Sequence, residues 1–269
     1  MTEIAGTARR ASNGTAMNVL ARFGLACRGF VYVVIGWLAF QVALGHGQHQ
    51  ANQTGALAAV AQHSFGELLL WVLGLGFAAY AIWRLSQAAF GTSTDGDKAG
   101  PRLKALVRGL IYAGLAVVTF NFVVGTPPKG QRQQQVTLTA RLLKHDVGRW
   151  AVAAVGLVVV AVGVAQIVEG LSKRFTKQLQ MHELTGATRT VIVRLGVIGT
   201  TARGVVFALA GGLVVDAALT YDAAKSTGLD GALRTLADQP YGPWLLGAVA
   251  VGLVAFGVFG LASARYAKT

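Results

Sequence analysis

The sequence predicts an all-α polytopic membrane protein, with six transmembrane helices arranged as three parallel two-helix repeats around a pseudo-threefold axis along the membrane normal. Two observations carry this prediction. Hydrophobic residues make up 54% of the 269-residue chain and charged residues only 13%, and the charges gather between long apolar runs. In addition, the motif Arg-Gly-x-x-aromatic occurs three times, each time at the edge of an apolar run.

Six stretches are long enough to cross a bilayer, which takes roughly 20 predominantly apolar residues. They are predicted at residues 22–44, 66–90, 104–124, 148–171, 194–219 and 242–264. Residues 1–21 are polar and lack the apolar core and small-residue cleavage site of a signal peptide, so we expect a disordered cytoplasmic tail there. Residues 22–266 then form a single membrane domain, with repeats at approximately 22–90, 102–171 and 194–265.

The repeats are defined by a shared motif and a shared spacing. Arg28, Arg108 and Arg203 are each followed by glycine and, four residues on, by an aromatic residue: Tyr32, Tyr112 and Phe207. A second shared glycine, at position 66, 148 or 242, follows each arginine by 38, 40 or 39 residues and opens the second helix of the unit. Since two helices return the chain to the same side, all three units have one orientation, as in parallel transporter repeats.

Small residues recur every seven positions along these helices. Lipid gives no hydrophobic drive between helices, so close packing relies on glycine and alanine, and a seven-residue spacing suits left-handed packing. We expect helix packing rather than a phosphate-cradling loop, which needs its glycines in a turn. Seventeen of eighteen such positions are Gly or Ala, the exception being Val123: Gly29, Gly36, Ala43, Gly109, Ala116, Val123, Gly204, Gly211, Ala218, Gly74, Ala81, Ala88, Gly156, Gly163, Gly170, Ala250, Gly257 and Ala264.

The basic residues predict an orientation. With both termini inside, cytoplasmic segments hold 14 Lys and Arg residues and external loops hold 7, which follows the positive-inside rule despite the basic loop at 125–149. The same bias accounts for the net charge of +13 without a nucleic-acid partner. We expect a multi-pass protein of the cytoplasmic (inner) membrane, N-in and C-in, with anionic lipid headgroups as partners on the cytoplasmic side.

Arg28, Arg108 and Arg203 lie inside predicted spans, where charges are costly and mark either function or pairing. At about two turns from the cytoplasmic end, each can bend its head toward the lipid phosphates. Alternatively, the three converge as an anion or headgroup site, or they pair internally. Glu169 is the one acidic candidate partner near this end, and one carboxylate cannot neutralise three guanidinium groups.

A second set of polar residues recurs nearer the external side. Gln41, Asn121 and Asp216 each stand thirteen residues after an arginine of the motif. If the small-residue stripes pack each hairpin internally, these side chains are free to form a polar ring on the axis, with Asp216 as a cation or proton site. The alternative is three separate interhelical hydrogen bonds.

Enzyme chemistry finds little support in the sequence. His46, His49 and His63 have no cysteine or nearby acid to complete a metal site, so no metal is expected. No nucleophile–base arrangement and no nucleotide-binding motif occurs, and no cofactor is expected. Cys27, the single cysteine, reads as a small buried residue.

The triplicated Arg-Gly-x-x-aromatic motif, with Gly-Ala-Leu before the second helix of the first and third units, resembles a bacterial integral membrane family of unknown function. The likeness covers roughly residues 20–266, and the middle unit departs from it most. It implies a cytoplasmic-membrane location and carries over no catalytic residue.

Two classes of function therefore stand. In the first, the protein is a small ion or solute transporter or pore. In the second, it is a non-transporting scaffold that binds lipids or protein partners. A polar axial cavity favours the first class, and a dry, Gly/Ala-packed axis favours the second.

Overall fold

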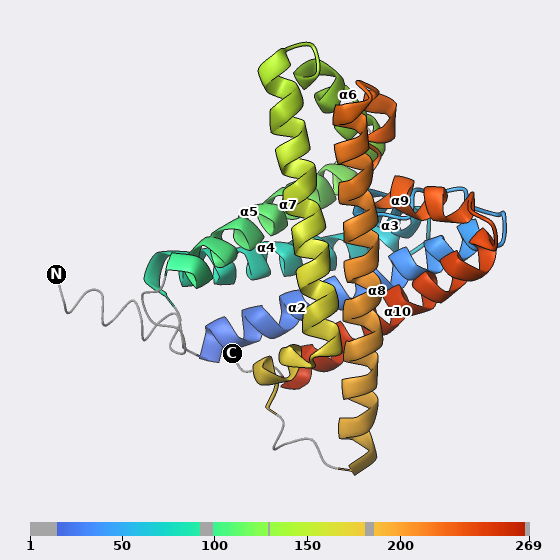
Figure 1. The fold of residues 1–269 in the computed structure, drawn as a ribbon. Helices are drawn as coiled ribbons and strands as arrows, with labels where there is room; N and C mark the ends of the chain where they lie inside the picture. Colours follow the sequence, from blue (N-terminus) through green and yellow to red (C-terminus); the bar gives the residue numbers. More distant parts are fainter. Residues whose placement is uncertain (1–14, 92–98, 129, 181–185, 267–269) are drawn as a thin grey trace.

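A computed structural model describes residues 15–91, 99–128, 130–180 and 186–266, and these ranges are almost entirely helical. Six long helices have the length and composition of membrane spans, which confirms the prediction of a six-helix protein. They are α2 (Thr15–Ala43), α4 (Gly66–Phe90), α5 (Ala99–Val123), α7 (Asp146–Leu171), α8 (Gly186–Leu219) and α10 (Gly242–Tyr266). We call the two long helices of a repeat, with the loop that joins them, its hairpin. α2 begins and α10 ends on one side of the molecule, which we name the termini side (Figure 1).

Each hairpin contains a short helix that the sequence analysis did not anticipate. These helices are α3 (Gln53–Ala61), α6 (Gln131–Leu142) and α9 (Gly228–Ala237). They occupy the side opposite the termini side, named here the loop side. In α3, the Asn52 side chain caps the first turn by accepting a 2.9 Å hydrogen bond from Gly55 N, as a helix N-cap does.

Three predicted boundaries shift in the structure. α2 begins at Thr15, inside the segment expected to be a tail, while residues 1–14 lie outside the described residues. α5 and α8 begin at Ala99 and Gly186, five and eight residues before the predicted spans. The apolar run marks only the part of a helix that suits lipid, and each of these helices continues beyond it into the residues that precede the run.

The closest helix packing joins neighbouring repeats rather than the two helices of one hairpin. The tightly packed pairs are α4 with α5, α7 with α8, and α10 with α2. Figure 1 shows these three pairs running side by side and splaying away from one another. Each pair unites the second helix of one repeat with the first helix of the next, and α10 closes the series back onto α2.

Glycines of the small-residue stripes form these contacts. A Cβ atom added to Gly257 of α10 would lie 2.6 Å from Gly29 O and from Val33 N, both in α2. On the α7–α8 pair, a Cβ at Gly204 would meet Gly163 O at 2.7 Å. The stripes are therefore packing surfaces, but they join repeats. The condition set for the polar ring, that the stripes pack each hairpin internally, is therefore not met, because the second helix of each hairpin lies against the first helix of another repeat.

The middle repeat breaks the cyclic pattern. α2 packs on α4 and α8 on α10 within their hairpins, whereas α5 and α7 are not a packed pair in the described part of the chain. Only 17% of the apolar window of α5 and 22% of that of α7 are buried, against 50–56% in α2, α4 and α10. α5 and α7 thus form an open, lipid-facing flank of the molecule.

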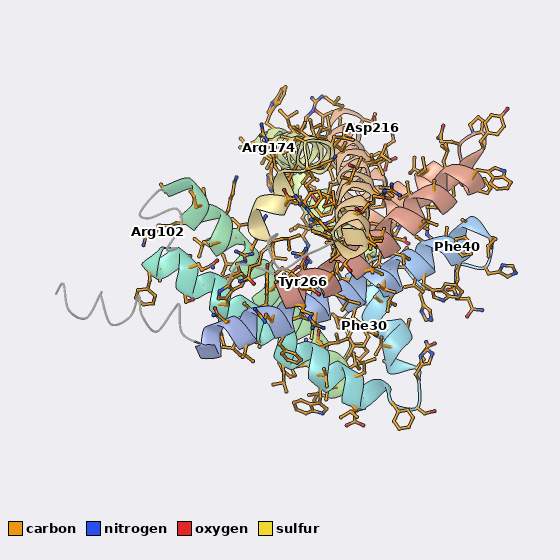
Figure 2. All side chains as sticks on the ribbon, turned by 90° about the horizontal axis from the view of Figure 1, so that it is seen from below. Phe30, Phe40, Arg102, Arg174, Asp216 and Tyr266 are labelled. Carbon is orange, nitrogen blue, oxygen red and sulfur yellow. The ribbon has the colours of Figure 1, made fainter. Side chains whose placement is uncertain are left out.

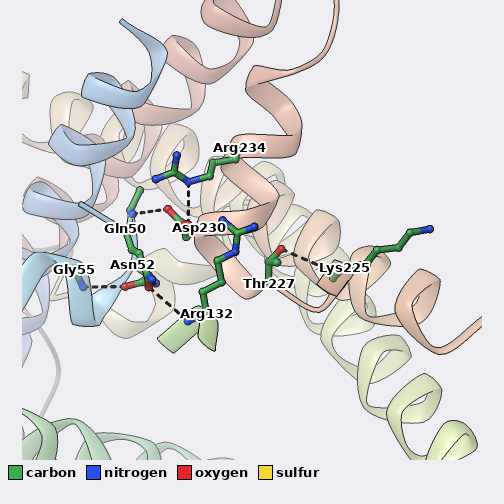
Figure 3. A network of polar contacts seen from close by, with 9 residues as sticks. Gln50, Asn52, Gly55, Arg132, Lys225, Thr227, Asp230 and Arg234 are labelled. Atoms are coloured by element: carbon green, nitrogen blue, oxygen red, sulfur yellow. Dashed lines mark hydrogen bonds and ion pairs between the residues drawn. The ribbon is translucent and has the colours of Figure 1, made fainter. Parts of the chain in front are cut away.

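On the loop side, polar contacts interlock all three repeats (Figure 3). The fully buried carboxylate of Asp230, on α9, accepts two hydrogen bonds. Ala51 N of the first repeat donates one at 2.9 Å, and Arg234 Nε donates the other at 3.0 Å. Thr139 of α6 donates to the Ser226 hydroxyl at 2.9 Å, which ties the second repeat to the third. These contacts make the loop side a closed layer over the long helices.

Candidate functional site

The arginine of the third repeat binds residues from both other repeats. Arg203 donates through Nε to the Tyr32 hydroxyl at 2.9 Å and through Nη1 to Gln166 Oε1 at 2.7 Å. Its guanidinium also lies over the rings of Phe207 and Phe256, 4.7 and 5.0 Å from their centroids. Arg203 stands near the middle of the 34-residue α8, so its head turns inward to the helix junction rather than along the helix to a lipid phosphate.

Arg28, on α2, shares a ring with Arg203. Its guanidinium lies 5.1 Å from the centroid of Phe256, so the two arginines lie against the same aromatic side chain. Arg28 lies near the hydroxyls of Tyr112, Tyr80 and Tyr32, and the Tyr80 hydroxyl is close enough to accept a hydrogen bond from its guanidinium. Its Nε is buried and has no hydrogen-bond partner. A buried, unpaired donor on a cation is costly, and it is a position where a ligand acceptor would bind favourably.

Arg84 of α4 adds a fourth cation that the motif did not reveal. It donates from Nε and Nη2 to the Tyr80 hydroxyl at 3.1 and 2.9 Å and from Nη1 to Gln87 Oε1 at 2.9 Å. Its guanidinium lies 4.1 Å from the centroid of Trp83, a cation–π contact. Arg84 is thus held in place by neutral groups of its own helix.

Arg108, on α5, is the least engaged of the four. It is exposed and lies within electrostatic range of Arg84, Arg28 and Arg203. It forms no hydrogen bond or ion pair with another residue in the described part of the chain. Its guanidinium therefore has donors to offer, next to three other positive charges.

The aromatic residues of the motif differ in what they can accept. Arg203 of the third repeat donates to Tyr32, the motif tyrosine of the first repeat. The motif aromatic residue of the third repeat is Phe207, which has no hydroxyl to accept a hydrogen bond. Two of the three repeats thus supply a tyrosine hydroxyl at this position, and the third does not.

The arginine cluster, defined as Arg28, Arg84, Arg108 and Arg203, has no carboxylate counter-charge among the described residues. Glu169, the expected acidic partner, forms no ion pair with any of the four. Gln166, one turn earlier on α7, occupies the position against Arg203. Neutral oxygen atoms and aromatic faces orient the guanidinium groups but do not cancel their charge, and planar guanidinium donors match the geometry of oxyanions.

The structure does not bring together the side chains of the candidate polar ring, Gln41, Asn121 and Asp216. Asp216 forms a 2.7 Å ion pair with Lys225, and the two side chains are 46% and 37% exposed. Gln41 and Asn121 are half-buried near the loop-side ends of α2 and α5, where their backbone carbonyls accept from His46 N and Thr126 N in the following turns. No hydrogen bond links the three described side chains, and the polar ring stays a prediction.

A cavity of about 370 Å³ lies on the loop side, between α6, α7, α8 and α9. Its polar part includes Gln131, Gln135 and Ser226, and its apolar wall includes Val159 and Phe207. Phe207 separates this cavity from the arginine cluster, because the same ring contacts Arg203. Sequence reasoning found neither this cavity nor Arg84, Gln166 and Phe256; the amide-rich run that begins α6 was the one signal for the cavity.

Comparison with known proteins agrees with the repeats. Residues 23–91, 103–173 and 198–267 each match the family described as Domain of Unknown Function (DUF1206). The chain is also 28% identical over 248 residues to "Uncharacterized protein YxxB" of Bacillus subtilis (strain 168), an alignment that covers 91% of this chain and 89% of that protein. No solved structure matches the chain. With three matches that together span most of its length, each headed by its own arginine and aromatic residue, the chain belongs to the DUF1206 family.

Proposed function

We propose that this membrane protein binds a small anion at the arginine cluster and moves it across the inner membrane. The observation that carries the proposal is the uncompensated charge of Arg28 and Arg108. Arg28 has a buried Nε without a hydrogen-bond partner. Arg108 forms no hydrogen bond or ion pair within the described part of the chain. Charges inside a membrane domain are expensive and usually serve a ligand or ion pathway.

Geometry favours an oxyanion. Arg84 and Arg203 are held by tyrosine and glutamine oxygens, so they supply a fixed positive field. Arg28, through its unpaired Nε, and Arg108 then provide guanidinium donors, which match the oxygens of a phosphate, sulfate or carboxylate group. With both termini in the cytoplasm, as the charge bias favours, the cluster lies in the cytoplasmic half of the helices that carry Arg28 and Arg108.

Binding without transport is the second candidate function. The junction of the helices is filled by aromatic rings, including Tyr80 on Tyr112 with centroids 4.5 Å apart and Tyr32 on Phe256 at 4.7 Å. This filled core supports a scaffold in which the cluster holds the phosphate of a lipid headgroup. Neither function assigns a catalytic step to the protein.

The test uses the full chain in proteoliposomes, with uptake of radiolabelled phosphate, sulfate and chloride driven by a membrane potential. We expect uptake of at least one anion above that of empty vesicles, and a drop of about tenfold in Arg108→Gln, the loss of one charge-assisted contact. Arg102→Gln is the matched control. Arg102 is a cation of the same helix and lies at the outer end of the α4–α5 pair (Figure 2), where it donates to Ala88 O and Ala89 O.

Arg28→Lys accompanies Arg28→Gln, because the glutamine variant removes a buried cation and can impair folding. The lysine variant keeps the charge but lacks the guanidinium fork, so it should insert normally and lose uptake. If no anion is taken up by any protein, while Arg108→Gln loses an anionic lipid that co-purifies with the wild type, transport is wrong and the scaffold function stands.

A further inference from the structure

We infer that the loop-side cavity is a second binding site, for a neutral amphiphile with a hydrogen-bond-donating head and an aliphatic tail. This site is separate from the arginine cluster, and its ligand chemistry is the opposite. The cavity presents acceptor oxygens, whereas the cluster presents cationic donors.

The polar part of the cavity is built from glutamine side chains of α6. Gln131 Oε1 and Gln135 Oε1 are both buried and have no hydrogen-bond partner. Gly228, at φ +63°, borders the cavity and makes room for the Gln135 amide, because any side chain at that position would collide with the amide oxygen. Two buried amide oxygens without donors are unfavourable on their own, and a ligand N–H or O–H group relieves both.

The charge around the cavity excludes an ionic head group. No aspartate or glutamate lines it, so an ammonium group would lack a counter-charge there. The unpaired carbonyl oxygens would repel an anion. A hydroxyl or a carboxamide is therefore the head group that the site suits best.

The remaining wall is apolar and opens toward the bilayer. Val152, Val155 and Val159 of α7 line it, together with Phe207, Ala210 and Val214 of α8. Val155 is 59% exposed, so the cavity reaches the lipid-facing surface of α7. The volume of about 370 Å³ falls in the usual range of small-molecule pockets, roughly 300–1,000 Å³. The cavity lies where the second repeat meets the third, since its walls come from α6 and α7 of one and from α8 and α9 of the other.

The test is photoaffinity labelling of the full chain in phosphatidylcholine nanodiscs. The probe is decanamide with a diazirine on its tail, and the labelled residues are mapped by mass spectrometry. We expect labels on cavity residues of α7 and α8, competed by unlabelled decanamide but not by methyl decanoate, which has the same tail and no donor.

Three variants make the result specific. Gln131→Leu with Gln135→Leu should lower cavity labelling about tenfold, since both acceptors are lost. Val159→Phe should abolish it by filling the cavity. Gln133→Leu, an exposed glutamine of the same helix, should leave labelling unchanged. Labels spread evenly over the lipid-facing surfaces of α5 and α7, with no effect of the glutamine variants, would overturn the inference.

The natural amphiphile can come from the bilayer or from solution, and the experiment separates the two sources. If a neutral hydroxyl-headed lipid such as diacylglycerol, added to the nanodiscs, competes with the probe, then the site takes a membrane lipid. If it does not compete while decanamide does, then the ligand is a free amphiphile. Either result supports a donor-headed occupant, and both are independent of anion uptake at the cluster.

Discussion

Arg203 and Tyr32 stand 171 residues apart in the chain, yet Arg203 Nε donates a 2.9 Å hydrogen bond to the Tyr32 hydroxyl in the interior of the helix bundle. The same guanidinium lies 5.3 Å from the centroid of the Tyr32 ring. One tyrosine therefore gives the arginine both an acceptor and an aromatic face, and it ties the first repeat to the third.

Removing the hydroxyl alone should weaken this link. Tyr32→Phe keeps the ring and its edge contact with Phe256 but leaves Arg203 Nε without its acceptor. We expect the free energy of unfolding in nanodiscs to fall by about 1–2 kcal/mol. The control is Tyr241→Phe, which removes a hydroxyl from a residue that is 81% exposed. Equal stability of the two variants would show that the hydrogen bond contributes nothing.

Glycine at position 257 should be required by packing, and glycine at position 247 should not. Gly257→Ala places a methyl group 2.6 Å from two α2 backbone atoms and should cost about 1–3 kcal/mol of unfolding free energy. Gly247→Ala, on the same helix, meets nothing within 4 Å and should be neutral or stabilise by up to about 1 kcal/mol through helix propensity. Unfolding of both variants by denaturant in detergent micelles checks the difference; a harmless Gly257→Ala would refute close α10–α2 packing.

The buried carboxylate of Asp230 should stabilise the loop-side layer. Asp230→Ala leaves Ala51 N–H buried without an acceptor, a cost of about 1–3 kcal/mol. We expect faster amide hydrogen exchange in α3 and α9, measured by mass spectrometry, with little change in α5. Asp238→Ala, an exposed aspartate just beyond α9, is the control. Unchanged exchange in α3 would mean that Asp230 does not connect the two repeats.

The charge bias predicts an N-in, C-in orientation, which can be checked directly. A reporter fused after Lys268 should read cytoplasmic, and one inserted in the loop at 45–65 should read external. An insertion in that loop also perturbs the Asp230 contact, so a small epitope tag after His46 is preferable. If the two reporters read the other way round, the arginine cluster belongs to the external half and the direction of the proposed transport is reversed.

Much of the fold could be predicted from the sequence because the chain contains three repeats. Apolar length gave the six spans, and the recurrence of Arg28, Arg108 and Arg203 gave the three units. The glycine stripe predicted close helix contact, but the spacing of its residues does not identify which helix packs against it. Whether Gly257 faces its own hairpin or α2 depends on tertiary packing, which the spacing of residues in one helix cannot express.

The site was readable only in part. The motif identified three arginines and their aromatic neighbours. Arg84 and Gln166 share a repeat position, eighteen residues after the second glycine of their units, but the residue type there changes from arginine to glutamine to Gly260, so no common motif marked it. Glu169 attracted attention because it is charged, yet one helical turn decides which side chain faces Arg203, and Gln166 occupies that face. The cavity depends on how α6 and α7 of the second repeat meet α8 and α9 of the third, and only the long-range packing determines that arrangement.

The contact between α10 and α2 also governs the order of assembly. The α4–α5 and α7–α8 pairs are neighbours along the chain, so each can form as soon as its second helix has entered the bilayer. The closest partner of α2 is α10, the last of the six long helices in chain order. The groove at Gly29 and Gly36 must therefore wait, lined by lipid, until α10 has been synthesised and inserted. A chain truncated before α10 would be inserted in the membrane with the groove of α2 exposed. Membrane quality-control proteases should therefore degrade it faster than the chain that carries α10.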